Sequence, residues 1–331
     1  MPLNILRHDE LHLLYDNIFH PFCDIETNFD PSINQEFENL RTGCKYYTLT
    51  TTGTPSCNQE VGKLFVLHLN VRSLLNTNKF EALLTFLHLT GIQWDIVCIS
   101  ETWLNCDVIK YRNIDGFTAF FQNRHGRMGG GVAIYIRTAC VTSTNRLSLE
   151  CPTGTESIFV QCHLTCSKFI IGQVYRPPDS CPTLFTEQMS HILDSIGNLS
   201  TTVIIAGDFN FDLFNISSDA NVETFFHMFL SFGLFPLISL PTRQCDTRLS
   251  LLDNIYCNNI SCADDPGIIY DDLSDHFPVY MTLKVVSSKV LRRKKSVTCF
   301  NYHRIDDMRH FLQTELHDLT HVTDPILPVR E

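Results

Sequence analysis

One stretch constrains the fold of this chain more than any other. Residues 203–206 form a continuous apolar run that stops at a glycine and is followed by Asp208 and Asn210. An unbroken run of this kind is typical of a strand buried on both faces. Side chains two apart in an extended segment point the same way, so a carboxylate and an amide are expected side by side at the strand's end. Asp and Asn also favour turns, and this stretch alone is equally consistent with a capped turn.

The composition is that of a globular chain with a sizeable core. Of 331 residues, 44% are hydrophobic and 18% are charged, enough for one large domain or two ordinary ones. The formal net charge of −11 argues against a generally basic nucleic-acid coat, although a nuclease could still have acidic groups at its centre. No segment approaches the roughly 18 apolar residues of a membrane span, so no membrane partner is expected.

The cysteines indicate a reducing compartment. The 14 Cys include no Cys-x-x-Cys pair, and residues 1–18 lack the apolar segment of a secretory signal. We therefore expect synthesis in the cytoplasm, no secretion and reduced thiols. A zinc site is not expected, and the cluster of His8, His12, His20 and Cys23 is interpreted as incidental.

Three segments differ in their patterning. Residues 1–60 are predicted to form an irregular N-terminal extension, with a short helix near 12–19. Residues 61–286 are predicted to be the folded domain. Residues 287–331 begin with a basic run and are predicted to be a linker and C-terminal segment, in which the basic run is either solvated or in contact with nucleic acid.

Periodicity within the folded domain predicts an irregular alternation of strands and helices. Strands are predicted at 64–71, 95–100, 132–136, 157–163, 169–175, 203–206, 251–257 and 279–286, and helices at 79–90, 184–199 and 222–232. This order favours an α+β arrangement, within the broad α/β class, in which helices cover a pair of mixed sheets.

Polar side chains recur where the predicted strands end. They are Asn70, Glu101, Tyr175 with Arg176, Asp208 with Asn210, Asp253 with Asn254, and Ser274 with Asp275 and His276. Strand ends of such sheets commonly carry catalytic groups. A single polar group at one strand end would be interpreted as a turn, but six such groups in one domain are interpreted as a single site. By contrast, His68, His163 and His227 are interpreted as ordinary packed or surface histidines.

The residue types at these strand ends fit metal-assisted hydrolysis of a phosphodiester. Glu101 and Asn70 offer the oxygen ligands that Mg²⁺ prefers, and Mn²⁺ is the expected substitute. The pair at 208 and 210 suits activation and orientation of a water molecule. His276 suits proton transfer or phosphate stabilisation, and Asp253 suits fixing the tautomer of its ring.

Basic and phenolic side chains are expected to contact the substrate. Tyr175 ends a predicted strand and Arg176 directly follows it, and both side chains suit binding of a phosphate. Arg243 and Arg248 lie in a polar loop that leads to Asp253, where either solvation or contact with a DNA backbone is expected.

Five motifs occur in a fixed order: Asn70, Ser100-Glu101-Thr102-Trp103, Gly207-Asp208-Phe209-Asn210, Leu252-Asp253-Asn254-Ile255 and Ser274-Asp275-His276. This ordered set resembles the endonuclease/exonuclease/phosphatase superfamily. Finer details resemble the apurinic-type endonuclease domain of non-LTR retrotransposons related to the CR1 and jockey groups. They are CKYY at 44–47, LHLNVRSL at 67–74, ETWL at 101–104, GGGVAI at 129–134, YRPP at 175–178 and SDHFP at 274–278.

The resemblance implies a DNase I-like, four-layer α/β/β/α sandwich that nicks duplex DNA with Mg²⁺. The nick would prime reverse transcription in the nucleus, and the element's RNA is a further expected partner. Motif matching implies roles for individual residues: Glu101 and Asn70 at the metal with Asp275 near it, Tyr175 at the phosphate, Asp208 and Asn210 at the water, and Asp253 paired with His276.

Two features depart from the family pattern. Repair-type relatives carry an acid two residues after the asparagine, where this chain has Arg72. A second metal ligand is therefore not expected at position 72, and a role in abasic-site repair is not expected for the chain. Arg72 is instead expected to contact a backbone phosphate. The chain also stops before a reverse transcriptase, as expected of a fragment, a truncated copy or a stand-alone derivative.

Two other functions remain open from the sequence. A phosphodiesterase acting on RNA, a nucleotide or a phospholipid headgroup would share this fold and metal site. A non-catalytic, domesticated or decayed copy is the alternative from a different class, and the complete ligand set disfavours it. The oligomeric state is not indicated.

Overall fold

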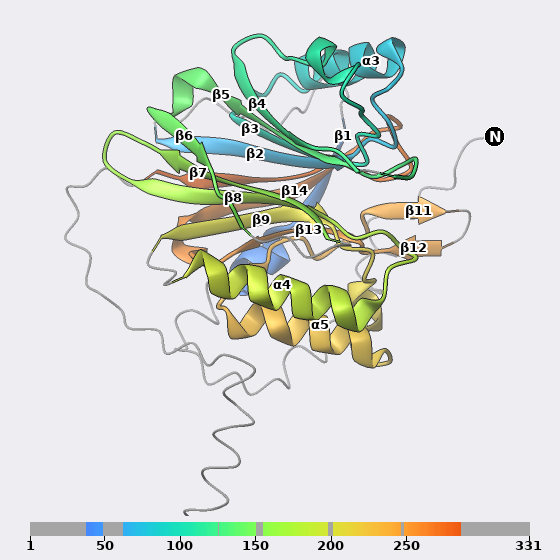
Figure 1. Ribbon diagram of the computed structural model, residues 1–331. Helices are drawn as coiled ribbons and strands as arrows, with labels where there is room; N and C mark the ends of the chain where they lie inside the picture. The colour runs from blue at the N-terminus through green and yellow to red at the C-terminus, as the bar shows by residue number, and fades with distance from the viewer. Residues whose placement is uncertain are drawn as a thin grey trace, which may run out of the picture.

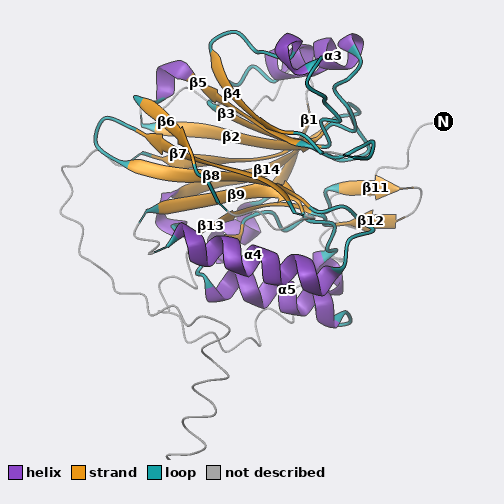
Figure 2. Ribbon diagram, viewed as in Figure 1, coloured by secondary structure: helices purple, strands orange, loops and turns teal. Residues whose placement is uncertain are grey.

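Two β-sheets stacked face to face form the centre of the molecule, and helices cover both outer faces (Figure 1). Helix α3 (Thr77–Leu89) lies over one sheet, and α4 (Pro182–Ile196) and α5 (Ala220–Ser231) lie side by side over the other (Figure 2). This confirms the predicted four-layer sandwich. The computed structural model describes residues 38–48, 62–124, 126–149, 155–197, 201–245 and 248–285. None of the helices in these ranges is long and apolar enough to cross a membrane.

The first sheet is mixed and contains seven strands within the described residues. Their spatial order is β1 (Lys45–Thr48), β14 (Ala263–Tyr270), β15 (Val279–Lys284), β2 (Lys63–Asn70), β3 (Ile96–Ser100), β5 (Val132–Arg137) and β4 (Phe117–Gln122). Strands β2 and β3 run parallel, with Asn70 opposite Ser100. Parallel neighbours end at the same edge of a sheet, so Asn70 and the following Glu101 arrive together.

The second sheet contains six of the described strands. Their order is β10 (Phe235–Pro236), β13 (Asp253–Cys257), β9 (Thr202–Asp208), β8 (Lys168–Tyr175), β7 (Glu156–His163) and β6 (Ser143–Arg146). Strand β9 runs parallel to β8 and antiparallel to β13, and the register places Asp208 between Tyr175 and Asp253. A row of three polar side chains thus crosses three strands at one edge.

The main core lies between the two sheets and beneath the helices of the second. Residues 203–206 have no exposed surface, because one face of β9 meets the other sheet and the opposite face meets the helical layer. Strands β7 and β8, both predicted, pair antiparallel as a hairpin in which Ser157 lies opposite Val174 and Cys162 opposite Phe169.

Local signals set where the helices begin and end. The side chains of Asn76 and Asp219 cap α3 and α5 by accepting hydrogen bonds from backbone N–H groups two residues on. Helix α4 begins at Pro182 and stops before Gly197, whose φ is +77°, so it ends earlier than predicted. Single turns of 3₁₀ helix are η2 (Ile109–Tyr111), η3 (Thr138–Cys140), η4 (Leu213–Asn215) and η5 (Ile260–Cys262).

Several strands were not predicted. They are β1, β4, β6, β10, β14 and the small hairpin of β11 (Arg243–Cys245) and β12 (Arg248–Ser250), which projects beyond the sheets (Figure 1). Strand β14 includes two aspartates and a proline, and its pairing with β15 shifts register between Asp264 and Gly267. Such a bulge interrupts the alternation by which a strand is predicted.

Part of the predicted irregular extension belongs to the fold. Residues 38–43 are helical, and β1 pairs in parallel with β14 at the edge of the first sheet. Cys44 is buried, and the Tyr46 hydroxyl donates to the Pro241 carbonyl at 2.6 Å. The prediction of an irregular extension is therefore wrong for residues 38–48. The partners of this segment, in β14 and at Pro241, lie about 200 residues further along the chain, so no local pattern indicates them. The helix predicted near 12–19 and the segment 287–331 lie outside the described residues.

Candidate active site

Asp208 and Asn210 flank a buried phenylalanine at the end of β9. The ring of Phe209 packs 5.4 Å from that of Phe225 in α5 and 5.3 Å from that of Tyr256 in β13. The backbone then turns at Asn210, whose φ is +49°, and its N–H donates back to Asp208 Oδ1 at 3.1 Å. This aromatic anchor and the turn hold the Asp208 carboxylate at the strand's end.

Asn70 connects Asp208 in one sheet to Glu101 at the end of the other. Its Nδ2 lies 2.9 Å from Glu101 Oε1 and 2.9 Å from Asp208 Oδ2. Glu101 has a φ of +54°, and its Oε2 accepts a hydrogen bond from Trp103 Nε1 at 3.0 Å. Left-handed backbone at a glutamate is energetically unfavourable and is typical of functional sites.

Asp253 and His276 form the predicted buried pair. His276 Nδ1 lies 2.7 Å from Asp253 Oδ2, and both side chains are almost inaccessible to solvent. The Thr242 hydroxyl donates to the same oxygen at 2.8 Å and accepts from the N–H of Asp253 at 3.0 Å. These contacts fix the His276 ring and direct its second nitrogen away from Asp253.

The charges in this cluster shift pKa values in opposite directions. Burial and the negative charge of Asp253 raise the pKa of Asp208 to about 7. Burial alone would raise the pKa of Asp253, but the charge of His276 and its hydrogen bond hold that pKa below the ordinary value. Burial would lower the pKa of His276, but the two aspartates outweigh it and raise that pKa to about 9. At neutral pH the cluster therefore holds an imidazolium, an ionised Asp253 and an Asp208 able to take up a proton.

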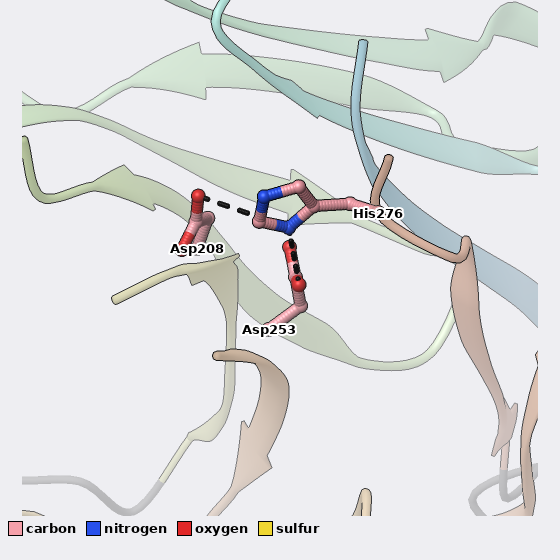
Figure 3. Close-up of side chains that lie close together, drawn as sticks. All are labelled: Asp208, Asp253 and His276. Atoms are coloured by element: carbon pink, nitrogen blue, oxygen red, sulfur yellow. Dashed lines mark hydrogen bonds and ion pairs between the residues drawn. The ribbon is translucent and has the colours of Figure 1, made fainter. Parts of the chain in front are cut away.

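Figure 3 shows Asp208 and Asp253 on two sides of the His276 ring. Potential ligand atoms of the three residues lie within 4.8 Å of one another, close enough to hold a metal ion. However, Asp253 Oδ2 already accepts from His276 and Thr242, and an imidazolium would repel a cation. The cluster is therefore better suited to proton transfer than to metal binding.

Glu101 provides the better position for a cation, whereas Asn70 donates from Nδ2 to two carboxylates and its Oδ1 accepts from the N–H of Arg72 at 3.1 Å. The Glu101 carboxylate accepts hydrogen bonds only from neutral groups that the described residues supply, those of Asn70, Trp103 and Tyr175. No salt bridge between described residues involves it. A half-buried carboxylate without a basic partner, beside an amide, fits a hard divalent cation.

Asp275 faces arginines. Its Oδ2 lies 3.1 Å from Arg72 Nη1 and 2.9 Å from Arg243 Nη2. The residue predicted to lie near the metal is thus, in this structure, the bridge between two basic side chains. Arg248 is exposed on β12, in the same hairpin as Arg243. We call Arg72, Arg243, Arg248 and Asp275 the rim of the site.

Arg176 does not belong to the rim. It is 4% exposed, and its guanidinium donates to the carbonyls of Asn210 and Ser180, both at 2.9 Å. It also stacks 4.3 Å from the ring centroid of Phe211. This placement contradicts the prediction that Arg176 contacts substrate. Successive strand residues face opposite ways, so Tyr175 faces the site while Arg176 braces the turn after Asp208.

Tyr175 is surrounded by charged groups. Burial and the negative charges of Glu101 and Asp208 raise the pKa of its phenol, which therefore remains a hydrogen-bond donor. The Arg124 guanidinium lies 5.8 Å from the centre of its ring. Arg124 is paired with Glu156, which also accepts from the N–H of Gly131. The glycine turn at 129–131 is thereby fastened beside Tyr175.

Three buried residues around Asp253 were not recognised from the sequence as part of the site: Thr242, His68 and Gln173. The sequence alone favours an ordinary packed or surface histidine at position 68. It lies two positions before Asn70 on β2, a polar residue on the same strand face, and that spacing was an available signal. Thr242 lies in a loop with no comparable signal.

Comparisons with known proteins agree with this fold. The endonuclease domain of TRAS1, a telomere-specific non-LTR retrotransposon, aligns with a TM-score of 0.52 and 18% identity over 68% of this chain and 100% of that domain. AP endonuclease LMAP from Leishmania major aligns with a TM-score of 0.56 and 14% identity, over 77% of this chain and 99% of that chain. The human Nocturnin catalytic domain aligns with a TM-score of 0.50 and 14% identity, over 68% of this chain and 94% of that domain. At these identities the likeness establishes the fold alone.

No curated protein sequence matches the chain significantly. The model of the Endonuclease/Exonuclease/phosphatase family, in contrast, matches residues 67–276, which span all five sequence motifs. With the fold of nucleases and phosphodiesterases and a buried acid–histidine cluster at its strand ends, the chain belongs to the Endonuclease/Exonuclease/phosphatase family.

Proposed function

We propose that this chain is a Mg²⁺-dependent DNA endonuclease of the non-LTR retrotransposon kind, which nicks one strand in the nucleus to prime reverse transcription. One observation carries the proposal: Asp208 lies between Asn70 with Glu101 on one side and the Asp253–His276 pair on the other. The likeness to the TRAS1 endonuclease domain and the family's sequence motifs favour DNA as the substrate.

Glu101 would hold the cation, with Asp275 available if its arginines turn to the substrate. Asn70, predicted as a ligand, would instead orient the Glu101 and Asp208 carboxylates through its Nδ2. A divalent cation bound there would neutralise charge that develops on the phosphate oxygens during hydrolysis. An oxygen-only donor set favours Mg²⁺, with Mn²⁺ as a substitute.

The chain's own groups then have distinct tasks. Asp208 accepts a proton from the attacking water, and Asn210 orients that water. A bond forms between the water oxygen and phosphorus as the P–O3′ bond breaks. The leaving O3′ takes up a proton from solvent water, which gives a 3′-hydroxyl and a 5′-phosphate. His276, protonated and held by Asp253, donates to a phosphate oxygen, and Tyr175 donates to another.

The rim is the proposed contact with the duplex. Arg72, Arg243 and Arg248 are at least partly exposed and would meet backbone phosphates, which supply most of the affinity in DNA binding. Because the net charge is −11, these contacts must be local, and we expect modest affinity with a shallow dependence on salt.

The test is nicking of supercoiled plasmid by the full chain in Mg²⁺, in Mn²⁺ and in excess chelator, with Asp208→Asn as the control. Open circles should appear before linear product with either metal, and plasmid should stay intact with chelator or in the variant. Hydrolysis of poly(A) RNA or a phosphorylated small molecule with intact plasmid would replace the proposal by a phosphodiesterase. Activity on none of these substrates would support a non-catalytic copy.

A further inference from the structure

A chain of four buried side chains crosses from one sheet to the other behind His276. Gln173 Oε1 on β8 lies 3.1 Å from His68 Nδ1, and His68 Nε2 on β2 lies 3.3 Å from Asp253 Oδ1. Asp253 Oδ2 in turn meets His276 at 2.7 Å. His68 and Gln173 have no exposed surface. Asp253 is therefore held between two imidazoles, and of these only His276 belongs to the five ordered motifs.

We propose that His68 is a positioning residue for the hydrolytic reaction: it holds Asp253 Oδ1, so that Oδ2 stays directed at His276. A carboxylate has two equivalent oxygens, and rotation about its terminal bond is broad. In this structure the two oxygens differ in their partners: Oδ2 accepts hydrogen bonds from His276 and Thr242, whereas Oδ1 accepts one from His68. The inference rests on the proposed hydrolase function but on no particular substrate.

The direction of the His68–Asp253 hydrogen bond follows from the acceptor. The carboxylate of Asp253 can only accept, so His68 Nε2 carries the hydrogen. On the far side of the ring, Gln173 either accepts from Nδ1 or, with its amide turned, donates to it. In both arrangements Gln173 keeps the ring oriented and Nε2–H faces Asp253.

Strand β2 serves both acids of the site. Asp208 and Asp253 are direct partners in the register of β9 and β13, where like charges destabilise a pair. From the facing sheet, β2 supplies a donor to each: Asn70 Nδ2 to Asp208 and His68 Nε2 to Asp253. The two donors are two residues apart, which matches the period of the strand. His68 thus does for Asp253 what Asn70 does for Asp208: each donates to one oxygen of a buried carboxylate.

The experiment compares His68→Leu, which removes the donor, with His68→Gln, whose amide can still reach Asp253. Under saturating plasmid and Mg²⁺, His68→Leu should lower kcat about 10-fold with little change in KM, the scale typical of residues that orient a reacting group. His68→Gln should recover most of the rate. Val66→Ala, also buried and on the same face of β2, is the matched control for stability and should leave kcat within about twofold.

Two further measurements separate positioning from a structural role. In an Asp253→Asn background, His68→Leu should cost less than about twofold, because both residues act through His276. In NMR spectra of the free protein, the downfield Nδ1 proton of His276 should shift or broaden in His68→Leu and stay in place in Val66→Ala. If His68→Leu fails to fold, Gln173→Leu replaces it, with a loss of about threefold.

Wild-type kcat in the folded His68→Leu protein, or an unchanged His276 resonance, would overturn the proposal. So would an equal loss of rate in the Asp253→Asn background. If the wild-type chain hydrolyses no phosphodiester, the function proposed above fails instead. The NMR comparison still decides the role of His68 in that case, because it requires no substrate.

Discussion

On the buried side of the site, Asp208, Asp253 and His276 are each at most 3% exposed, and protein groups surround them. At the rim, Arg72 keeps 55% of its side chain in solvent and Arg243 keeps 32%. The buried groups are oriented before any substrate arrives, and their low-dielectric surroundings shift their pKa values. The rim charges are hydrated and screened by salt, so they can select and hold a substrate but contribute little to the chemical step.

The largest effect should come from the buried side. Replacing either His276 or Asp208 by Ala should lower turnover by about 10²-fold or more, because each change would remove one of the two groups proposed to transfer protons. The double variant should be far from additive, since both act on one path. Single-turnover nicking with equal amounts of folded protein measures this. A His276→Ala enzyme with the wild-type rate would refute the role assigned to the imidazole.

The cation position at Glu101 should give the next largest effect. Glu101→Gln should raise the Mg²⁺ concentration needed for half-maximal rate by about 10- to 100-fold, because a neutral amide replaces the charged ligand. Thermal stability in chelator should change little, since the hydrogen bonds to Glu101 come from neutral groups. The measurement is a Mg²⁺ titration of the initial rate, with Glu156→Gln as a matched control outside the cation position. An unchanged Mg²⁺ requirement in Glu101→Gln would place the cation elsewhere.

The pH dependence of the rate should report the same buried groups. Asp208 acts as a base only when ionised, and its pKa is raised to about 7, so the rate should fall about tenfold per pH unit below that value. His276 donates only when protonated, and its pKa is raised to about 9, so the rate should fall above pH 9. Initial rates measured across this range should give a bell-shaped profile. An acid limb near the ordinary pKa of Asp would contradict the proposed base.

Stability should depend on pH with a defined sign. The folded pKa of His276, about 9, lies above its unfolded value of about 6.5. The stabilisation from its protonated form is therefore fully present below pH 6.5 and is lost as pH rises toward 9. Thermal unfolding in chelator should show the melting temperatures of wild type and His276→Gln converging over that range. Parallel curves would show that His276 has no raised pKa.

Removing the N-terminal strand should have a moderate effect on the loops behind the buried pair. A chain that starts at Gly62 loses β1, and with it the Tyr46 contacts to Pro241 and to the ring of Phe277 next to His276. We expect a loss of about 3 kcal/mol in unfolding free energy and a reduced rate. A chain that starts at Glu38 keeps these contacts and is the control. Equal melting temperatures for the two shortened chains would show that β1 is dispensable.

The smallest effect should come from the rim. Arg243→Ala should raise KM a few-fold and reduce the slope of log affinity against log salt by about 1, because one phosphate contact is lost. Arg176→Ala is the informative comparison, since that guanidinium is buried. It should lower the melting temperature without changing the slope. Binding of a short DNA duplex measured at several salt concentrations separates the two outcomes.

The strand-end motifs were predictable because each combines two local signals. An apolar run predicts the strand, and the polar residue that ends it marks the edge of the sheet, as for Asn70 and Asp208. The main helices and most central strands were found in the same way. Strand β14 was missed because a bulge breaks its alternation, and β1 because four residues are too few to show a period.

The sequence by itself determined the family, the layered fold and the set of polar residues at the strand ends. Only the tertiary structure decided the partners of those residues: His68 against Asp253, Arg72 and Arg243 against Asp275, and Arg176 buried beneath the turn at Asn210. Local periodicity states which face of a strand a side chain occupies, whereas a hydrogen bond across the sandwich depends on how two sheets, built from distant segments, are stacked. Stacking is a collective result of packing the whole core, and no short stretch of sequence encodes it.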